Sequence, residues 1–394
     1  MSSTAEARAL SPELRASIYH FTVFAATGVA SVYFGIWLSR RGISPDETGI
    51  INALPVLLML LINTFIGRLA DRASDWKQVI VVLSLVAGVA PVGMFFVSDF
   101  WGILAIWTLC MVPAASLVPV VDAATLRMTQ RRNTSFSFVR GWGTVGYTVT
   151  TAAAGPLIAM WGEDAFVPLF LAFALCRALA ALQLPRFRAP AGEALPALSA
   201  RPVARKLRDV LKLWFVLPIF GFGVVYASNS PLGSFAGLLW KEQGIDEIAI
   251  GLLIAVSAGS EAIMLFAWRR LNLKVSARHL IILAALVAIF RWSMMAFNPP
   301  LWALVILQML HAFTFAMGYL GGIYFIANWT SEDIAAEAQG FSSVVQQGMT
   351  VIVLLGFGVS VSAFGTGAWL VLGGFCLLGV VLPLISLRLQ PRHT

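Results

Sequence analysis

Residues 47–72 read ETGIINALPVLLMLLINTFIGRLADR and contain the two features that decide the fold. The apolar run over 47–66 has the length that an α-helix needs to cross the hydrocarbon core of a bilayer, about 20 residues. A short basic segment, Gly67-Arg68-Leu69-Ala70-Asp71-Arg72, follows it and is expected to be a loop. Similar runs recur along the chain, and the sequence predicts twelve membrane-spanning helices, at 16–39, 47–66, 79–97, 101–126, 137–161, 165–184, 214–240, 247–268, 279–297, 301–327, 338–363 and 367–387.

The composition is that of an all-α, polytopic membrane protein. Hydrophobic residues make up 59% of the 394 residues and charged residues 12%, against about 25% charged in an ordinary soluble domain. A soluble globular protein is therefore excluded. Residues 1–15 are polar and the first apolar run already has spanning length, so no cleavable signal peptide is expected.

Lysine and arginine are distributed unevenly between the two sides of the predicted membrane. Of the 27 basic residues, 21 fall in tails and loops on the side of the N-terminus, three on the other side, and three within apolar runs. Cytoplasmic loops carry such an excess, so both termini are expected in the cytoplasm. The expected location of the chain is a bacterial cytoplasmic (inner) membrane. The same bias explains the net charge of +8 without a nucleic-acid partner.

A break in the apolar pattern divides the chain. Residues 185–213 combine four prolines with seven basic residues and predict a cytoplasmic linker. The expected domains are an N-terminal six-helix half over 1–184 and a C-terminal six-helix half over 214–394. Two such halves are typical of secondary transporters.

The first half places a charged pair inside the membrane. Arg140 opens the fifth span, and Thr144 and Tyr147 follow on the same helical face, with Trp142 nearby. Asp122, near the end of the fourth span, is the expected counter-ion. The set predicts a substrate-binding site, and the alternative is a structural ion pair that joins the two helices.

The second half contains a different set of ionisable groups. Glu261 is its one acid within an apolar run, and Arg291 and His311 lie in the next two spans. A carboxylate beside an imidazole in a dry cavity can exchange a proton, so these residues are expected to serve proton coupling. The alternative for His311 is a hydrogen-bonding role in the core.

Uncharged polar side chains also recur at positions that face the interior of the predicted bundle. They include Tyr226, Asn229 and Gln346, and such groups are rarely left facing lipid. Each alone is explained by contacts between helices. Together they predict a polar cavity between the halves, in which these three side chains contact the substrate.

The basic segment resembles the G-x-L-x-D-R signature of the major facilitator superfamily. Ser74, Asp75 and Trp76 depart from the glycine and basic residues that usually follow in that family. The resemblance implies the twelve-helix major facilitator fold. It also implies a gating loop, to which Gly67, Asp71 and Arg72 belong.

The intramembrane residues resemble two branches of this superfamily. Asp122, Arg140 and the pair Gly146-Tyr147 are similar to the sugar-site stretch of lactose permease, and Glu261, Arg291 and His311 to its proton-coupling residues. The phenylpropionate permease branch is more similar still, at 139–143, 260–267 and 308–315. Charged residues of lactose permease are absent here, and uncharged ones stand in their place: Ser230, Gln308, Thr314 and Gln346.

These observations predict a proton-coupled symporter that imports a small organic solute by alternating access. The resemblance favours an aromatic carboxylate of the phenylpropionate kind, held by Arg140. A sugar, a nucleoside or a siderophore remains an alternative substrate, and a transport-dead receptor an alternative function. The sequence has no H-E-x-x-H, no G-x-S-x-G and no P-loop motif, so no enzyme is expected. The expected partners are the substrate, protons and the bilayer, with no cofactor, no metal and a monomeric state.

Overall fold

The computed structural model describes residues 10–187, 211–271, 275–329 and 332–389, and these residues form helices without a β-strand. The first six-helix half consists of the following elements: α1 (Pro12–Arg40), α2 (Pro45–Arg72), α3 (Trp76–Val89) with the 3₁₀ turn η1 (Ala90–Phe95), α4 (Phe100–Arg131), α5 (Phe136–Trp161), and η2 (Glu163–Ala165) with α6 (Phe166–Leu182).

Three of the six spans of the second half are broken into shorter helices. The seventh span is α8 (Leu213–Ala227), α9 (Ser230–Ser234) and α10 (Ala236–Glu242). The eighth and ninth are α11 (Glu247–Leu271) and α12 (Ala277–Met295). The tenth is α13 (Leu301–Met309), a π-helical turn η3 (Ala312–Met317) and α14 (Gly318–Trp329). The last two are α15 (Glu332–Phe364) and, after η4 (Gly365–Gly367), α16 (Ala368–Phe375) with α17 (Leu377–Leu389).

The twelve expected spans therefore correspond to twelve helical segments in two halves. Within the described ranges, ten stretches are long and apolar enough to cross a membrane, and the last of them, Ala338–Leu389, runs through the final two spans. The fifth span, α5, is not among them. Its polar face includes Arg140 and Thr144, which lower its hydropathy.

The basic segment 67–72 is helical, so the expectation of a loop there is wrong. Helix α2 continues to Arg72 and ends at Ala73, and Asp75 caps the next helix by accepting from the backbone N–H of Lys77. One glycine is tolerated inside a helix, and the following residues are helix formers, which explains the extension. Arg72 is exposed, and the surroundings of Gly67 and the side chain of Asp71 lie outside the described part of the structure.

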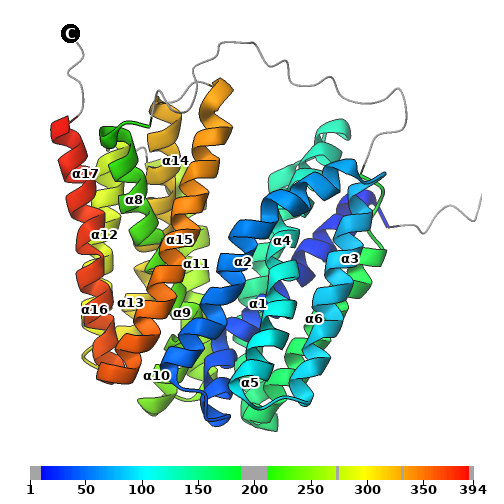
Figure 1. Ribbon diagram of the computed structural model, residues 1–394, viewed down its shortest axis with the longest axis horizontal. Helices are drawn as coiled ribbons and strands as arrows, with labels where there is room; N and C mark the ends of the chain where they lie inside the picture. Colours follow the sequence, from blue (N-terminus) through cyan, green and yellow to red (C-terminus); the bar gives the residue numbers. More distant parts are fainter. Residues whose placement is uncertain (1–9, 188–210, 272–274, 330–331, 390–394) are drawn as a thin grey trace, which may run out of the picture.

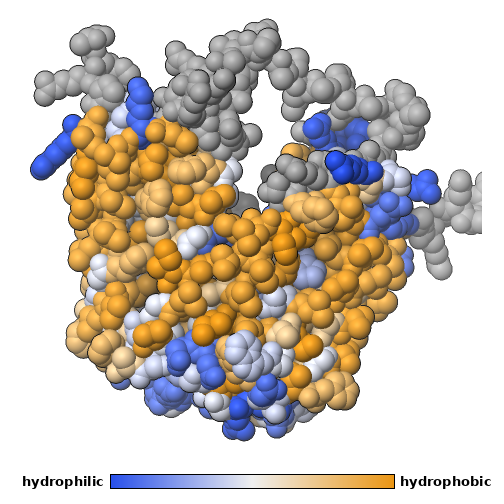
Figure 2. All heavy atoms as spheres, viewed as in Figure 1, coloured by the Kyte–Doolittle hydropathy of each residue, from blue (hydrophilic) through white to orange (hydrophobic). Residues whose placement is uncertain are grey.

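The two halves stand side by side, touch at one end and separate toward the end where the linker leaves them (Figure 1). Glycines permit the close approach at the touching end: a Cβ on Gly251 of α11 would lie 2.6 Å from the carbonyl oxygen of Thr151 on α5. Figure 2 shows the hollow between the halves on the linker side. We call the touching end the closed end and the other the linker end.

Large apolar side chains cover the outside of both halves, as expected of a surface in contact with lipid (Figure 2). Aromatic rings fill the interior. In the first half Phe34 stacks on Trp107, with ring centroids 3.6 Å apart, and in the second half Trp292 stacks on Trp369 at 5.3 Å. These clusters hold the helices that carry the polar residues described next.

The start of the linker is fastened to the first half. The Asp75 carboxylate accepts from the backbone N–H of Phe187, at 3.0 Å, and Nζ of Lys77 donates to the carbonyl oxygen of Leu184 at 2.5 Å. Phe187 is itself buried. The departure at position 75 from the family signature therefore has a structural function in this chain.

Candidate substrate-binding site

A cavity of about 810 Å³ lies between the halves. Its lining comes from α1, α5, α8, α9, α11, η3, α14 and α15. Eight residues that the sequence analysis singled out line it: Arg140, Thr144, Tyr147, Tyr226, Asn229, Gln346, Glu261 and His311. The structure thus brings together most of the predicted substrate-binding residues and two of the three predicted coupling residues.

Arg140 lies on the first-half side of the cavity and pairs with Asp122. Its Nε lies 3.0 Å from Oδ1 of Asp122, and each side chain is about one-third exposed. The guanidinium carbon lies 4.4 Å from the ring centre of Phe24, which fixes the plane of the group. Neither Nη atom of Arg140 donates a hydrogen bond to a described residue, so the fork remains open to a ligand.

Asp122 is not itself part of the cavity lining; it lies behind Arg140. Gly143 makes this arrangement possible, since a Cβ there would lie 2.9 Å from Nη1 of Arg140 and 2.7 Å from the Phe24 ring. The absence of a side chain at position 143 therefore leaves room for the guanidinium and the ring to stack.

Tyr147 and Thr144 continue the polar face of α5 along the cavity. The Tyr147 hydroxyl donates to Oγ of Ser31 on α1 at 3.0 Å, and Ser31 donates to the carbonyl oxygen of Gly28. These two hydrogen bonds orient the phenol toward the cavity. Trp142 is 41% exposed and does not line the cavity. It lies two residues after Arg140, and two residues of an α-helix rotate the side chain by about 200°, so Trp142 points away from the face that carries Arg140. Phe24 supplies the aromatic surface beside Arg140 in its place.

Arg291 is fully buried behind the second-half wall of the cavity. Its Nη2 donates to Gln308 Oε1 at 2.7 Å, and Nη1 lies within 3.2 Å of acceptors on Asn229, His311 and Thr314. All four acceptors are uncharged. No described carboxylate forms an ion pair with this guanidinium.

His311 separates Arg291 from Glu261. A guanidinium has only donors, so Nδ1 of His311 must accept from Arg291 and the imidazole proton is on Nε2. That nitrogen lies 3.5 Å from Oε2 of Glu261, whose side chain is 29% exposed to the cavity. The expected contact of Arg291 with the acid is therefore indirect, and His311 is the link.

An aromatic column beside these residues was missed in the sequence analysis. The rings of His311, Phe315 and Tyr319 are stacked, with centroids 5.2 Å and 6.4 Å apart, and Tyr226 lies 5.6 Å from Phe315. The π-helical turn widens the helix at this point, so that Thr314 faces Arg291 while Phe315 and Tyr319 face the cavity. The spacing i, i+4, i+8 of the three rings places them on one helical face, and this pattern in the sequence could have predicted the column.

The closed end holds a second cluster of charges, outside the cavity. Glu163 of η2 forms ion pairs with Arg40 of its own half and, at 3.5 Å, with Lys241 of the other half. Lys241 also pairs with Glu247. Glu163 is buried while Arg40 and Lys241 are exposed to solvent, so this cluster joins the two halves by a partly desolvated contact.

Known proteins resemble this chain over nearly its full length. The MFS_1 like family matches residues 14–365. The chain belongs to the major facilitator superfamily. It is 26% identical over 385 residues to a maltose permease of Geobacillus stearothermophilus, with 95% of this chain and 94% of that protein covered. It is 24% identical over 377 residues to a probable 3-phenylpropionic acid transporter of Escherichia coli (strain K12), with 94% and 95% covered.

Solved structures agree with this fold. The nucleoside transporter NupG superposes with a TM-score of 0.79 at 15% identity, covering 96% of this chain and all of that one. A bacterial homologue of the lysosomal transporter Spinster, inward-facing and occupied, superposes with a TM-score of 0.72 at 14% identity, covering 95% of this chain and 96% of that one. The chain is therefore a multi-pass membrane transporter of the major facilitator superfamily, and the relatives are named as transporters and not as enzymes.

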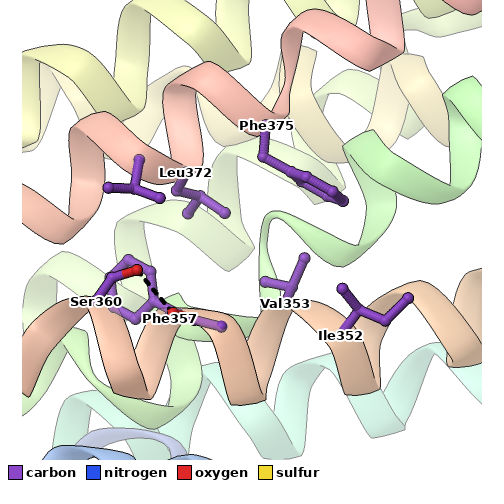
Figure 3. A pocket seen from close by; sticks show the side chains of 8 residues that line it. Ile352, Val353, Phe357, Ser360, Leu372 and Phe375 are labelled. Atoms are coloured by element: carbon purple, nitrogen blue, oxygen red, sulfur yellow. Dashed lines mark hydrogen bonds between the residues drawn. The ribbon is translucent and has the colours of Figure 1, made fainter.

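A smaller cavity in this transporter has no comparable chemistry. It has a volume of about 230 Å³, lies between α15 and α16, and is lined by side chains such as Ile352, Phe357 and Leu372 (Figure 3). Its one hydroxyl, on Ser360, donates to the carbonyl oxygen of Gly356 in its own helix. The cavity between the halves is therefore the candidate substrate site.

Proposed function

We propose that this transporter imports a small aromatic carboxylate together with protons. The observation that carries the proposal is the open guanidinium fork of Arg140 at the edge of a cavity walled by aromatic rings. A carboxylate fits the fork with two parallel hydrogen bonds. The ring of the same substrate then lies against Phe24, Tyr147, Phe315 or Tyr319.

The cavity suits a solute of this size. Sites for small molecules have volumes of about 300–1,000 Å³ and combine apolar walls with a few polar groups. Asn229, Gln346 and Tyr226 supply polar groups on the second-half side, and a relative is named as a 3-phenylpropionic acid transporter.

Protons are the proposed coupling ion. Glu261 faces the cavity and contacts His311, and these two groups of the wall can change their charge, whereas Thr314 cannot carry a proton. In the proposed cycle Glu261 binds a proton before the substrate is carried across and releases it on the linker side. His311 relays the effect of Arg291 on this carboxylate.

The proposed orientation follows from the basic residues. With the termini and the 185–213 linker in the cytoplasm of a bacterial inner-membrane protein, the linker end is the cytoplasmic end and this state is open to the inside. The halves 1–184 and 214–394 rock against each other as domains within one monomer, and the segment with Gly67, Asp71 and Arg72 takes part in gating.

A neutral, hydroxylated substrate is the second candidate. Asp122 accepts hydrogen bonds, sugars also stack on aromatic rings, and a relative is named as a maltose permease. In this alternative Arg140 and Asp122 both bind hydroxyl groups. Nucleosides belong to the same class of substrate, whereas a receptor without transport would bind but not accumulate its ligand.

Uptake into membrane vesicles tests the proposal. Vesicles containing the transporter are energised by an inward proton gradient, and accumulation of labelled 3-phenylpropionate, maltose and uridine is compared with that in vesicles lacking it. Gradient-dependent accumulation of the carboxylate alone is expected. Accumulation of maltose or uridine instead would favour the second candidate, and saturable binding without accumulation would favour a receptor.

A further inference from the structure

Two buried polar atoms face each other in the first half without a hydrogen bond. Nδ1 of His20, on α1, lies 3.9 Å from Oδ1 of Asp122, on α4. Nδ1 of His20 has no hydrogen-bond partner among the described residues and its side chain is fully buried, whereas Oδ1 of Asp122 already lies 3.0 Å from Nε of Arg140. Buried polar groups are nearly always paired, so the unpaired Nδ1 of His20 indicates a contact that forms in another state.

The opposite side of the imidazole is already held. Nε2 of His20 lies 3.2 Å from the hydroxyl of Thr125, one turn along α4 from Asp122. When that hydroxyl donates to Nε2, the imidazole proton lies on Nδ1 and points toward Asp122. His20 is thus oriented for a bond that is about 1 Å too long in this structure.

Among the described residues, Arg140 is the one permanent cation in contact with Asp122, and it also faces the cavity. An anionic ligand that takes the fork of Arg140 competes with Asp122 for it. Asp122 then remains as a carboxylate that is about two-thirds buried and has no counter-ion, a state that is disfavoured.

We propose that His20 is the second partner of Asp122 and takes up a proton when an anionic ligand engages Arg140. The proton comes from water in the cavity and binds to the imidazole, which closes on Oδ1 of Asp122. The ligand anion pairs with Arg140 and the imidazolium with Asp122, so the added charges cancel. This inference rests on the proposed anionic substrate, and it places a proton site in the first half that is independent of Glu261.

The surroundings of His20 contain no competing acid within the described residues. The groups that face it are Asp122 and Thr125 on α4 and Arg140 on α5. Tyr19, the residue before His20, hydrogen-bonds to Ser84 of α3 at 2.6 Å and interacts electrostatically with Arg177 of α6. His20 is accordingly a positioning residue, which acts on the ligand through Asp122 and Arg140.

The first experiment measures proton uptake on binding. The purified Glu261→Gln transporter, which lacks the second-half acid, is titrated with 3-phenylpropionate by calorimetry in buffers of different ionisation enthalpy between pH 5 and 8.5. We expect uptake of about one proton per ligand. His20→Gln is then added to the Glu261→Gln protein; glutamine keeps a hydrogen-bonding side chain but cannot become a cation. Proton uptake should move to lower pH, and ligand affinity near pH 7 should fall by about tenfold, the equivalent of one pKa unit.

Tyr19→Phe in the same background is the matched control. It removes a buried hydrogen bond from the neighbouring position of α1 without touching Asp122, so it should leave the pH profile in place. A His20→Gln profile that coincides with its parent would overturn the inference, since a purely structural role lowers stability without moving the profile.

A second experiment needs no substrate. Arg140→Gln removes the cation from Asp122 permanently, and nitrogen NMR of labelled histidine should then show His20 as an imidazolium at a pH where it is neutral in the parent; loss of the signal in His20→Gln assigns it. A neutral His20 in folded Arg140→Gln protein overturns the inference. If the parent protein fails to bind 3-phenylpropionate while the imidazolium forms in Arg140→Gln, the proposed substrate is wrong and the pairing of His20 with Asp122 stands.

Discussion

Nη1 of Arg291 lies 3.2 Å from Nδ1 of His311, and because a guanidinium cannot accept a hydrogen bond, this contact fixes the imidazole tautomer. The proton of His311 is thereby placed on the nitrogen that faces Glu261. A buried cation behind a neutral imidazole stabilises negative charge on the carboxylate in front of it. The three residues form one unit, in which only Glu261 reaches the cavity widely.

Glu261→Gln should strongly reduce accumulation of substrate against its gradient, because the proposed first-half site at His20 is then the only proton site left in the proposed cycle. Glutamine keeps the size and the hydrogen bonding of the side chain but cannot bind or release a proton. Exchange of labelled for unlabelled substrate needs no net proton release and should persist at least in part. Proton flux, followed with a pH-sensitive dye in reconstituted vesicles, is the measurement, and unaltered substrate-driven alkalinisation would assign coupling to the first half or indicate a uniporter.

Arg140→Lys should weaken binding by one to two orders of magnitude, about 1.5–3 kcal/mol, while expression stays near normal. Lysine keeps the charge but loses the fork that remains open toward the cavity. Direct binding of labelled substrate to purified protein gives the affinity. Normal binding and transport by this variant would mean that the pair with Asp122 only joins α4 and α5.

Asp122→Asn separates the two substrate classes. A carboxylate substrate should bind the variant at least as well as the parent, because asparagine no longer competes for Arg140. A sugar or nucleoside that uses the carboxylate as acceptor should lose affinity by about tenfold or more. The same binding assay with both kinds of ligand decides between them, and a loss for the carboxylate contradicts the proposed mode of binding.

Spans and site residues differ in how far the sequence determines them. Runs of about 20 apolar residues have one stable arrangement in a bilayer, so the twelve spans followed from length alone. The pair of Asp122 and Arg140 was also predictable, since a membrane charge needs a partner. Interruptions inside spans could not be predicted in the same way. The π-helical turn after His311, for example, contains no helix-breaking residue and depends on packing.

Contacts between distant helices set the remaining features. The position of His20 opposite Asp122 depends on the rotation of α1 against α4. The role of Arg291 likewise depends on His311 standing between it and Glu261. Helical periodicity predicts which residues share a face of one helix, but it does not predict how that helix is rotated against its neighbours.

Asp75→Ala should lower stability by about 1 kcal/mol, the usual contribution of an N-cap side chain. The carboxylate caps α3 and also holds the backbone N–H of Phe187. Asp75→Asn keeps an acceptor for the cap and is the matched control, with a smaller loss expected. Thermal unfolding of the purified variants ranks the stabilities of the parent, Asp75→Asn and Asp75→Ala. Equal stability of the parent and Asp75→Ala would show that the attachment of the linker does not stabilise the protein.

The ion cluster at the closed end should hold the transporter in the state seen here. Lys241 bridges Glu163 of the first half and Glu247 of its own half, and the hydrogen bond with Glu247 raises the pKa of Lys241, so the bridge stays charged at neutral pH. A raised lysine pKa means that this contribution is present at neutral pH and is lost only at strongly alkaline pH. Lys241→Met removes the bridge and leaves the side-chain length similar.

Accessibility of the cavity from the closed end measures the effect. Ser230 lines the cavity, so Ser230→Cys can report reaction with a membrane-impermeant maleimide added on that side. Lys241→Met should raise the labelling rate severalfold, because opening of the closed end no longer breaks the bridge to Glu163. Arg41→Gln is the control, since Arg41 pairs at 3.9 Å with Asp164 of the same half. Equal labelling in the Lys241→Met and Arg41→Gln proteins would mean that the packing of α5 against α11, and not the ion cluster, keeps this end closed.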